Sequence, residues 1–355
     1  MIVVIADDLT GAAELAGIAC SYGLQTEMLM EVASPLPSCD VLVVATDTRS
    51  MTEPEAVAYS RHLAGLLAGL PVQLFKKTDS ALRGHIMAEL SALLTVTHYD
   101  RVLFIPANPS KNRVIHQGVY YVDEKPISET AFLFDPEFPA LSSSLCDRFP
   151  EAATHNVLIP DVTSTADIRV AIDHLSADTL LAGAVDLFEA WLQNMGFLRQ
   201  RAMTSACVCQ ENLLVVCGST QGHPIPSHIS TSSMPLDVYE DAAPVSVWME
   251  QAIALYEKNH TLALKIPHHH LTGREVAVRL RDATAAVVQS LVALYHPSQL
   301  VIEGGATAFC CLKSIGWHTF LVKGEVAPGV VQMTAPCGTV ITLKPGSYDW
   351  GNFFL

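Results

Sequence analysis

Two adjacent carboxylates, Asp7 and Asp8, follow an apolar run at residues 1–5. Such a run predicts a buried strand that ends in an acidic turn, and a helical pattern begins at Ala12. Adjacent carboxylates at the end of a buried strand repel each other and lose hydration. They are therefore usually retained where a cation, a metal or a substrate hydroxyl interacts with them. We interpret this turn as a candidate active site.

Polar clusters with acids, cations and hydroxyl groups follow three more apolar runs. The expected strands and their clusters are 40–45 with 46–49, 72–75 with 76–80, and 101–105 with 106–110. Helical stretches at 52–70 and 81–94 separate them, and strands that alternate with helices predict parallel pairing through right-handed crossovers. Because ligands of such sheets bind beyond the carboxyl ends of the strands, we expect the clusters to meet at one edge and to suit a small, polyhydroxylated anion.

Glycine-rich turns follow strands in the later part of the chain. A strand expected at 213–217 leads into Gly218 and Ser219, and one at 300–302 leads into residues 303–308. Glycines at a strand-to-helix turn expose backbone N–H groups at a helix N-terminus, where a phosphate is stabilised. Tight packing of helix on strand is the alternative reason for such glycines, since neither a P-loop nor a G-x-G-x-x-G motif is present.

Length and composition predict a two-domain α/β protein. The chain has 355 residues, and half of them are apolar, which is enough for a sizeable core in each of two domains. We expect each domain to be built on a mainly parallel sheet flanked by helices. Further strands expected at 156–159 and 179–181 extend the first domain over 1–205, which leaves 206–355 for the second.

The charge balance argues against two classes of partner. With 36 acidic and 21 basic residues, the chain lacks the clustered positive charge that nucleic acids and anionic membranes require. Its longest apolar runs have the length of strands, and the N-terminal run lacks a basic leader. We therefore expect a cytoplasmic protein that binds small molecules. The oligomeric state stays open, a homo-oligomer included.

The order of these motifs resembles that of the four-carbon acid sugar kinases over nearly the whole chain. The motifs that carry the resemblance are 7–12, 46–49, 76–84, 118–122, 135–136, 218–219, 304–307 and 344–346. This family phosphorylates threonate, erythronate or 3-oxo-tetronate. The resemblance implies that the N-terminal domain binds the sugar acid and that the C-terminal domain binds ATP.

The resemblance also implies roles for individual residues. Asp8 or Asp7 would accept the proton of the attacking hydroxyl, and Lys77 would bind hydroxyls or the moving phosphoryl group. Arg49 and Arg83 would bind the substrate carboxylate. Further substrate contacts would come from Thr10, Gly11, Asp47, Asp79 and Ser80, and ATP contacts from Gly218, Ser219, Gly304, Gly305, Ala306, Thr307 and Gly346. Mg²⁺ would bridge the phosphates of ATP, and no protein ligand is assigned to it.

Each role has a structural alternative. One of the two adjacent acids could cap the following helix, and the two arginines could form ion pairs with Asp47 or Asp79. Thr78 and Ser80 could cap the next helix.

Two other functions stay open beside the kinase. One is a relative that binds a sugar acid but uses ATP poorly, because Ala306 stands where the family usually has an acid. The other is a phosphohydrolase with Asp7 as nucleophile, which the immediately following Asp8 disfavours, since that motif places its second acid two positions on.

Overall fold

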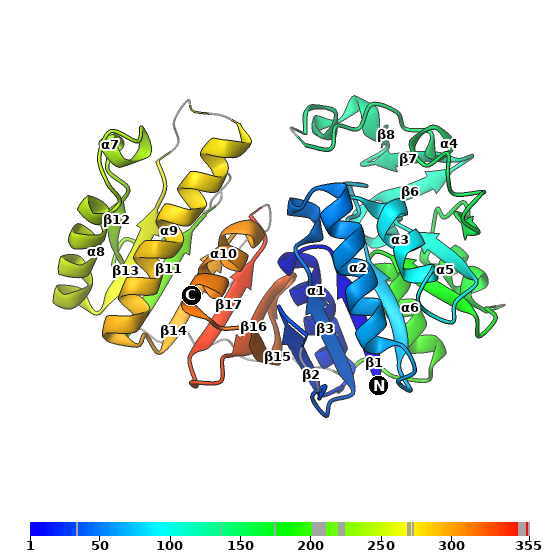
Figure 1. The fold of residues 1–355 in the computed structure, drawn as a ribbon, viewed down its shortest axis with the longest axis horizontal. Coiled ribbons are helices and arrows are strands. Elements are labelled where there is room, and N and C mark those ends of the chain that lie inside the picture. Colours follow the sequence, from blue (N-terminus) through cyan, green and yellow to red (C-terminus); the bar gives the residue numbers. More distant parts are fainter. Residues whose placement is uncertain are drawn as a thin grey trace. The chain divides into compact units, whose positions relative to one another are not determined.

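The computed structural model describes residues 1–32, 35–135, 137–173, 175–200, 211–218, 224–267, 271, 273–346 and 353. The chain divides into two compact units, and Figure 1 shows their elements in chain order. The first unit comprises Met1–Leu15 and Val32–Gln200, and the second comprises Ala16–Glu31 and Arg201–Leu355. The boundary predicted at residue 205 falls outside the described residues.

The first unit is built on a parallel sheet with the strand order β3-β1-β4-β10-β5-β9. Its strands are β1 (Ile2–Ala6), β3 (Val41–Ala45), β4 (Gln73–Lys77), β5 (Arg101–Ile105), β9 (Val157–Leu158) and β10 (Thr179–Gly183). All residues of β1 and β3 are buried, as their continuous apolar sequences predict for strands covered on both faces. The α/β class is confirmed.

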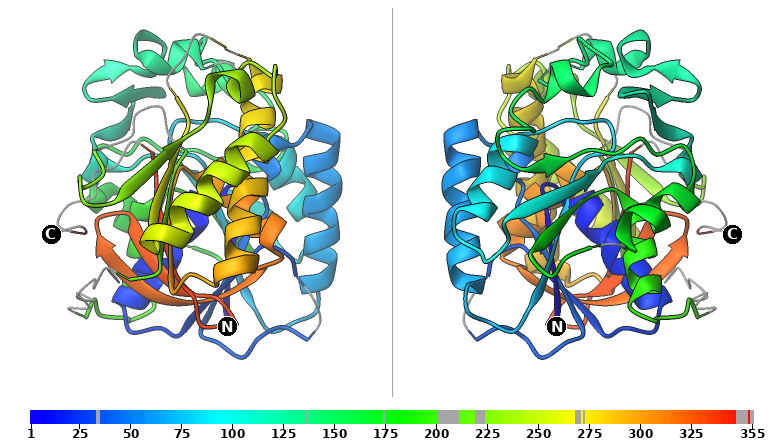
Figure 2. Two further views of the ribbon diagram at one scale, coloured as in Figure 1. Left: turned by 90° about the vertical axis from the view of Figure 1, so that its left-hand side faces the viewer. Right: turned by 90° about the vertical axis from the view of Figure 1, so that its right-hand side faces the viewer.

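Helices cover both faces of this sheet. The helices are α1 (Leu9–Ser21), which crosses the division between the units, α2 (Glu53–Leu67), α3 (Ile86–Leu94), α4 (Leu145–Arg148), α5 (Thr165–Ile172) and α6 (Val185–Asn194). On one face Phe75 of β4 meets Phe188 and Trp191 of α6, with ring centroids 5.1 and 5.8 Å apart. On the other face Lys76 reaches Glu89 of α3, which packs beside α2. Figure 2 shows α2 in blue on the side opposite the green α6.

A small antiparallel sheet, which the sequence patterns did not predict, adjoins β5 in the chain. It consists of β6 (Arg113–His116), β7 (Val119–Val122) and β8 (Lys125–Pro126). Its strands have at most four residues, too few for a clear period-two pattern.

The second unit has a mixed sheet with the order β12-β13-β11-β14-β17-β16-β15-β2. Its strands are β2 (Thr26–Leu29), β11 (Leu213–Cys217), β12 (Ser230–Ser233), β13 (Thr261–Lys265), β14 (Gln299–Glu303), β15 (Thr319–Ala327), β16 (Val330–Thr334) and β17 (Val340–Lys344). The pairs from β12 to β17 are parallel, and the remaining three pairs are antiparallel. The predicted parallel core is therefore present, with an antiparallel extension.

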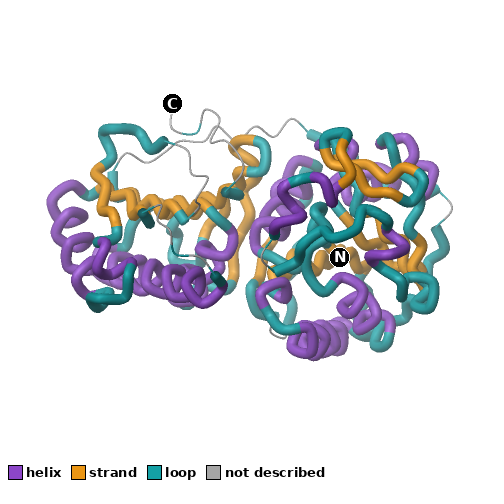
Figure 3. Tube along the Cα trace, turned by 90° about the horizontal axis from the view of Figure 1, so that it is seen from above, coloured by secondary structure: helices purple, strands orange, loops and turns teal. Residues whose placement is uncertain are grey.

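The helices of the second unit form a layer on one face of its sheet, as Figure 3 shows. They are α7 (Leu236–Tyr239), α8 (Ser246–Asn259), α9 (Arg274–Tyr295) and α10 (Gly305–Ile315), and α9 packs between α8 and α10. Val215 and Val301 of the sheet belong to a buried apolar cluster with Ile229 and Phe353. Within the described residues, no helix combines the length and the apolar character needed to cross a membrane.

The segment after β4 differs from the predicted helix at 81–94. Leu82 and Gly84 have φ values of +63° and +93°, which a right-handed helix does not allow. The helix therefore starts only at the first residue of α3, with His85 at the N-cap position. The alternative that Thr78 or Ser80 caps this helix is wrong.

Candidate active site

The carboxyl ends of five strands in the first unit lie level with one another. Ala6 is the register partner of both Ala45 and Lys77. Lys77 is in turn level with Gly183 of β10, which pairs with Ile105. The four polar clusters that follow β1, β3, β4 and β5 therefore begin at one edge of the sheet, as the sequence predicts.

One guanidinium group holds the two adjacent carboxylates. Arg49 Nε and Nη2 donate to Asp7 Oδ2 at 2.9 and 2.8 Å, and Nη1 donates to Asp8 Oδ2 at 3.1 Å. Nη2 also lies 3.7 Å from Asp79 Oδ1. The Arg49 side chain is only 16% exposed. Arg49 thus compensates three carboxylates in a largely buried setting, where an uncompensated charge would be strongly destabilising.

Asp8 also caps α1, as the structural alternative for one of the two adjacent acids predicts. Its Oδ1 accepts from Gly11 N at 2.9 Å, and its Oδ2 accepts from Thr10 Oγ1 at 2.6 Å. The helix begins at Leu9, three residues before the predicted start, because this cap satisfies its first turn. A Cβ on Gly11 would lie 2.7 Å from Asp8 Oδ1, so the cap requires glycine. Asp8 remains 19% exposed, against 3% for Asp7.

Burial and charge shift the pKa values of the two acids in opposite directions. Burial raises the pKa of Asp7, and the neighbouring Asp8 charge adds to this effect while Arg49 opposes it. Burial also acts to raise the pKa of Asp8, but Arg49, Lys77 and the Thr10 hydrogen bond outweigh it, and that pKa is lowered. Asp8 therefore keeps its negative charge over a wider pH range than Asp7.

Arg83 makes the ion pair with Asp79 that the structural alternative predicts. Its Nε and Nη2 donate to the two carboxylate oxygens of Asp79 at 2.7 and 3.1 Å. Burial raises the Asp79 pKa, but the charges of Arg49 and Arg83 outweigh burial and hold this pKa well below its usual range. Nη1 of Arg83 lies 3.6 Å from Asp135, and 32% of the side chain is exposed. Arg83 is therefore the more accessible of the two arginines.

Lys77 and Ser80 lie at the same edge. Lys77 is buried, and its Nζ donates to the Thr78 carbonyl at 2.9 Å. The Thr78 hydroxyl is buried and has no hydrogen-bond partner among the described residues. Ser80 accepts from Arg113 Nη1, and its carbonyl accepts from the Tyr120 hydroxyl at 2.7 Å. The edge therefore carries cations and hydroxyl groups beside the acids.

Asp47 occupies a left-handed turn at this edge. Its φ is +54°, and it is the N-cap of the short helix η1 (Thr48–Ser50). Its Oδ1 accepts from the Ser50 hydroxyl at 3.1 Å. This turn directs the Arg49 side chain toward Asp7 and Asp8.

In the second unit, the ends of β11, β14 and β17 are joined by backbone hydrogen bonds. Gly218 N donates to the Glu303 carbonyl at 3.1 Å, and Gly304 N donates to the Lys344 carbonyl at 2.9 Å. A Cβ on Gly218 would lie 2.3 Å from Thr307 Oγ1, so only glycine allows the two turns to approach this closely.

The predicted phosphate turns lie at this edge. Gly305, Ala306 and Thr307 form the first turn of α10, where backbone N–H groups lack helical partners. Gly304 precedes them with a φ of +97°. Gly346 follows β17, and Ser219 lies outside the described residues.

A buried ion pair beneath this turn was missed by sequence reasoning. Lys344 Nζ lies 2.6 Å from Glu303 Oε1, and neither side chain is exposed. The two residues are register partners at the last positions of adjacent strands. Charged residues that end apolar strands are the sequence signal that could have revealed this pair.

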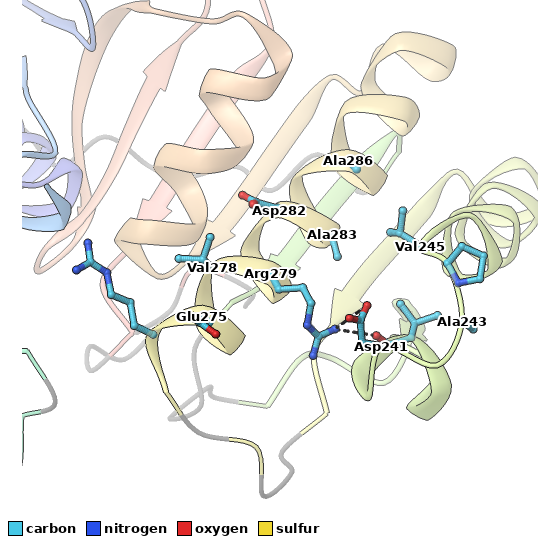
Figure 4. Close-up of a pocket in the computed structure, with 12 residues that line it drawn as sticks. Asp241, Ala243, Val245, Glu275, Val278, Arg279, Asp282, Ala283 and Ala286 are labelled. Atoms are coloured by element: carbon cyan, nitrogen blue, oxygen red, sulfur yellow. Dashed lines mark hydrogen bonds and ion pairs between the residues drawn. The ribbon is translucent and has the colours of Figure 1, made fainter.

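The second unit also contains a pocket of about 690 Å³ between α7 and α9 (Figure 4). Its apolar walls come from Val278, Ala283 and Ala286 of α9 and from Pro244 and Val245 before α8. Arg279 fixes one end, because it donates to the carbonyls of Val238 and Tyr239 at 3.1 and 2.6 Å. Such walls suit a flat apolar group with polar atoms at its rim.

Among the residues that the structure describes, no group of three or more His, Cys, Asp or Glu side chains is arranged to hold a metal ion.

Fold and site together define a two-domain α/β protein with a charged strand edge in one unit and glycine turns in the other. A family model described as a sugar-binding N-terminal domain matches residues 2–218, and one described as a nucleotide-binding C-terminal domain matches residues 240–348. With the relatives below, these matches show that the chain belongs to the four-carbon acid sugar kinase family.

Two relatives agree with this assignment, and a solved structure shares the fold. The chain is 32% identical to a 3-oxo-tetronate kinase of Actinobacillus succinogenes, over 100% of this chain and 98% of that protein. It is 23% identical to a D-threonate kinase of Salmonella typhimurium, over 96% of this chain and 91% of the relative. A crystal structure from Haemophilus influenzae shares the fold, with a TM-score of 0.72, 18% identity and coverage of 99% and 98% of the two chains.

Proposed function

We propose that this protein is an ATP-dependent kinase that phosphorylates a terminal hydroxyl of a four-carbon sugar acid of the threonate, erythronate or 3-oxo-tetronate type. Family membership and the names of its relatives support a sugar-acid kinase. The observation that carries the proposal is the strand edge where Arg49 holds three carboxylates beside Lys77 and Arg83.

Product analysis tests which hydroxyl is phosphorylated. A phosphate ester on the terminal carbon has two methylene protons as coupling partners, so its phosphorus signal should be a triplet in a proton-coupled ³¹P spectrum. A doublet would place the phosphate on a secondary hydroxyl and would contradict this part of the proposal.

Phosphoryl transfer depends mainly on positioning and charge, and this edge offers both. Asp8 would accept the proton of the attacking hydroxyl, because it is the more exposed acid and keeps its charge. Asp7 is the alternative acceptor, because its Oδ1 has no hydrogen-bond partner among the described residues, while its Oδ2 binds Arg49. Lys77 would offset negative charge on the transferring group.

The substrate carboxylate would bind at Arg83, the more exposed arginine of the edge. Hydroxyl groups of the sugar acid would bind near Asp79, Ser80 and Asp47, and near Thr10 and Gly11 at the start of α1. A guanidinium binds a carboxylate with two parallel hydrogen bonds, which a lysine ammonium cannot reproduce.

Arg83→Lys should raise the KM for the sugar acid about tenfold or more while changing the KM for ATP little. Steady-state kinetics with each substrate varied in turn measure both constants. Arg101→Lys is the matched control, because Arg101 is 59% exposed and belongs to β5 of the same unit. Equal increases of both constants would show that Arg83 has a structural role instead.

The second unit would bind ATP. The backbone N–H groups in the first turn of α10 lack helical partners and fit a phosphate group, and Gly218 packs closely against Thr307 in this turn. Gly304, Gly305, Ala306 and Gly346 would complete this site, and the pocket of α9 would take the base. Mg²⁺ would be held chiefly by the phosphates, since bound Mg²⁺ often has few protein ligands.

Gly218→Ala should raise the KM for ATP by about an order of magnitude while the KM for the sugar acid stays near its original value, because the new Cβ would collide with Thr307. The same kinetic assay measures both constants. Gly65→Ala is the control, since a Cβ at Gly65 in α2 meets nothing within 4 Å. An unchanged KM for ATP would remove Gly218 from the nucleotide site.

A further inference from the structure

We infer that the buried pair of Lys76 and Glu89 positions Arg49, acting through the hydroxyl group of Thr48. The site described above assigns no role to Lys76, Glu89 or Thr48. The kinetic test of this inference rests on the proposed function. The position of Arg49 can also be measured without turnover.

The pair lies in the interior of the first unit. Lys76 Nζ donates to Glu89 Oε2 at 2.6 Å, and each side chain is only 1% exposed. Lys76 is the residue before Lys77 on β4, so its side chain points to the opposite face of the sheet, toward α3. Two charges so deeply buried lose their hydration, and they need further hydrogen bonds to be compensated.

One of these further hydrogen bonds comes from the turn that carries Arg49. The Thr48 hydroxyl donates to Glu89 Oε2 at 2.9 Å, and Thr48 itself is fully buried. Ser60 of α2 donates to the same oxygen at 3.4 Å. Glu89 thus links β4, α2 and η1.

The turn needs such an anchor. It has a single three-residue helix preceded by Asp47 in a left-handed conformation, which is costly for a residue with a side chain. Arg49 N donates to the carbonyl of Asp7 at 3.2 Å, which ties the turn to the residue that follows β1. Glu89 holds Thr48 in place, and the Arg49 guanidinium contacts the carboxylates of Asp7 and Asp8 at 2.8 to 3.1 Å. A small shift of the backbone would break these contacts.

The structure offers a matched pair of variants. Thr48→Val and Ser60→Ala each remove one hydroxyl that donates to Glu89 Oε2, but only Thr48 belongs to the turn of Arg49, where its hydroxyl also pairs with Thr46 Oγ1 at 2.9 Å. Thr48→Val should lower kcat/KM for the sugar acid about tenfold or more, and Ser60→Ala should change it less than about twofold, with similar small shifts of Tm. Equal kinetic effects, or none in Thr48→Val, would overturn the inference.

A second measurement separates this inference from the proposed function. Arg49 lowers the Asp8 pKa, so displacement of Arg49 should raise it. Carboxyl ¹³C titration by NMR should therefore show a higher Asp8 pKa in Thr48→Val than in Ser60→Ala, whether or not the protein is a kinase. Identical Asp8 titrations in the two variants would overturn the inference. Absence of kinase activity in the wild-type protein would contradict only the proposed function.

The double variant Lys76→Met/Glu89→Leu tests a purely structural role. Replacing a buried ion pair by apolar residues often preserves stability. If the pair positions Arg49, a variant with nearly normal Tm should still have the lowered kcat/KM of Thr48→Val. Normal turnover in this variant would contradict the inference. If the double variant fails to fold, the comparison of Thr48→Val with Ser60→Ala decides.

Discussion

Replacing Asp8 by asparagine should lower kcat by about two to four orders of magnitude while leaving the affinity for the sugar acid largely intact. Asparagine caps helices about as well as aspartate, so the hydrogen bond from Gly11 N and the start of α1 should persist. The variant loses the negative charge, the ability to accept a proton and the ion pair with Arg49, because an amide NH2 replaces Oδ2. Single-turnover kinetics and calorimetry with the sugar acid measure the two quantities separately.

Two further variants sharpen this test. Asp167→Asn is the control, because Asp167 belongs to an N-terminal capping box of α5. It should leave kcat unchanged. Asp7→Asn tests the alternative acceptor. If kcat is normal in Asp8→Asn but falls in Asp7→Asn, Asp8 is only a cap, and the acceptor is Asp7.

Arg49→Gln should destabilise the protein by about 3–5 kcal/mol near neutral pH, because it leaves three carboxylates without their shared cation. Activity should be lost as well, since the acids would repel one another. Chemical denaturation of the variant and the wild type gives the difference in free energy of unfolding. The exposed Arg101→Lys variant should differ from wild type by less than about 0.5 kcal/mol. A similarly small effect in Arg49→Gln would contradict the role of Arg49 as counter-ion.

The pH dependence of this loss follows from the pKa shifts. The lowered pKa values of Asp8 and Asp79 mean that their ionisation stabilises the wild type at neutral pH, and that this contribution is lost as pH falls through those folded values. Asp7, whose pKa is raised, has the opposite effect on the pH dependence of stability. Its contribution to the stability of the folded state is lost as pH rises through its folded pKa. Without Arg49 all three acids should protonate more readily, so the deficit of Arg49→Gln should shrink toward acidic pH. A constant deficit would contradict this electrostatic origin.

Sequence reasoning predicted the strand edge of the first unit because parallel strands of similar length end level with one another. The register of Ala6 with Ala45 and Lys77 shows this directly. It could not choose the partner of Arg49, since the left-handed turn at Asp47 decides where the guanidinium lies. Asp7 and Asp8, rather than Asp47, are the acids that it contacts most closely.

Residues on helices were harder to predict. Glu89 is the only charged residue of the mainly apolar helix α3 and is the kind of residue that normally faces solvent. It is buried because Lys76, thirteen positions earlier on a strand, supplies its counter-charge.

The antiparallel strands β15 and β16 were also not predicted, since no sequence motif of the candidate site lies on them.

The function proposed for this chain is the transfer of a phosphoryl group from ATP to a four-carbon sugar acid. The most direct test measures ADP release by the purified protein with Mg-ATP and a panel of acids: both threonates, both erythronates, and their 3-oxo and 2-oxo relatives. We predict ADP release well above background with at least one of them, abolished in Asp8→Asn. No ADP release with any acid, while calorimetry still shows an acid binding, would contradict the kinase and favour a relative that has lost the use of ATP.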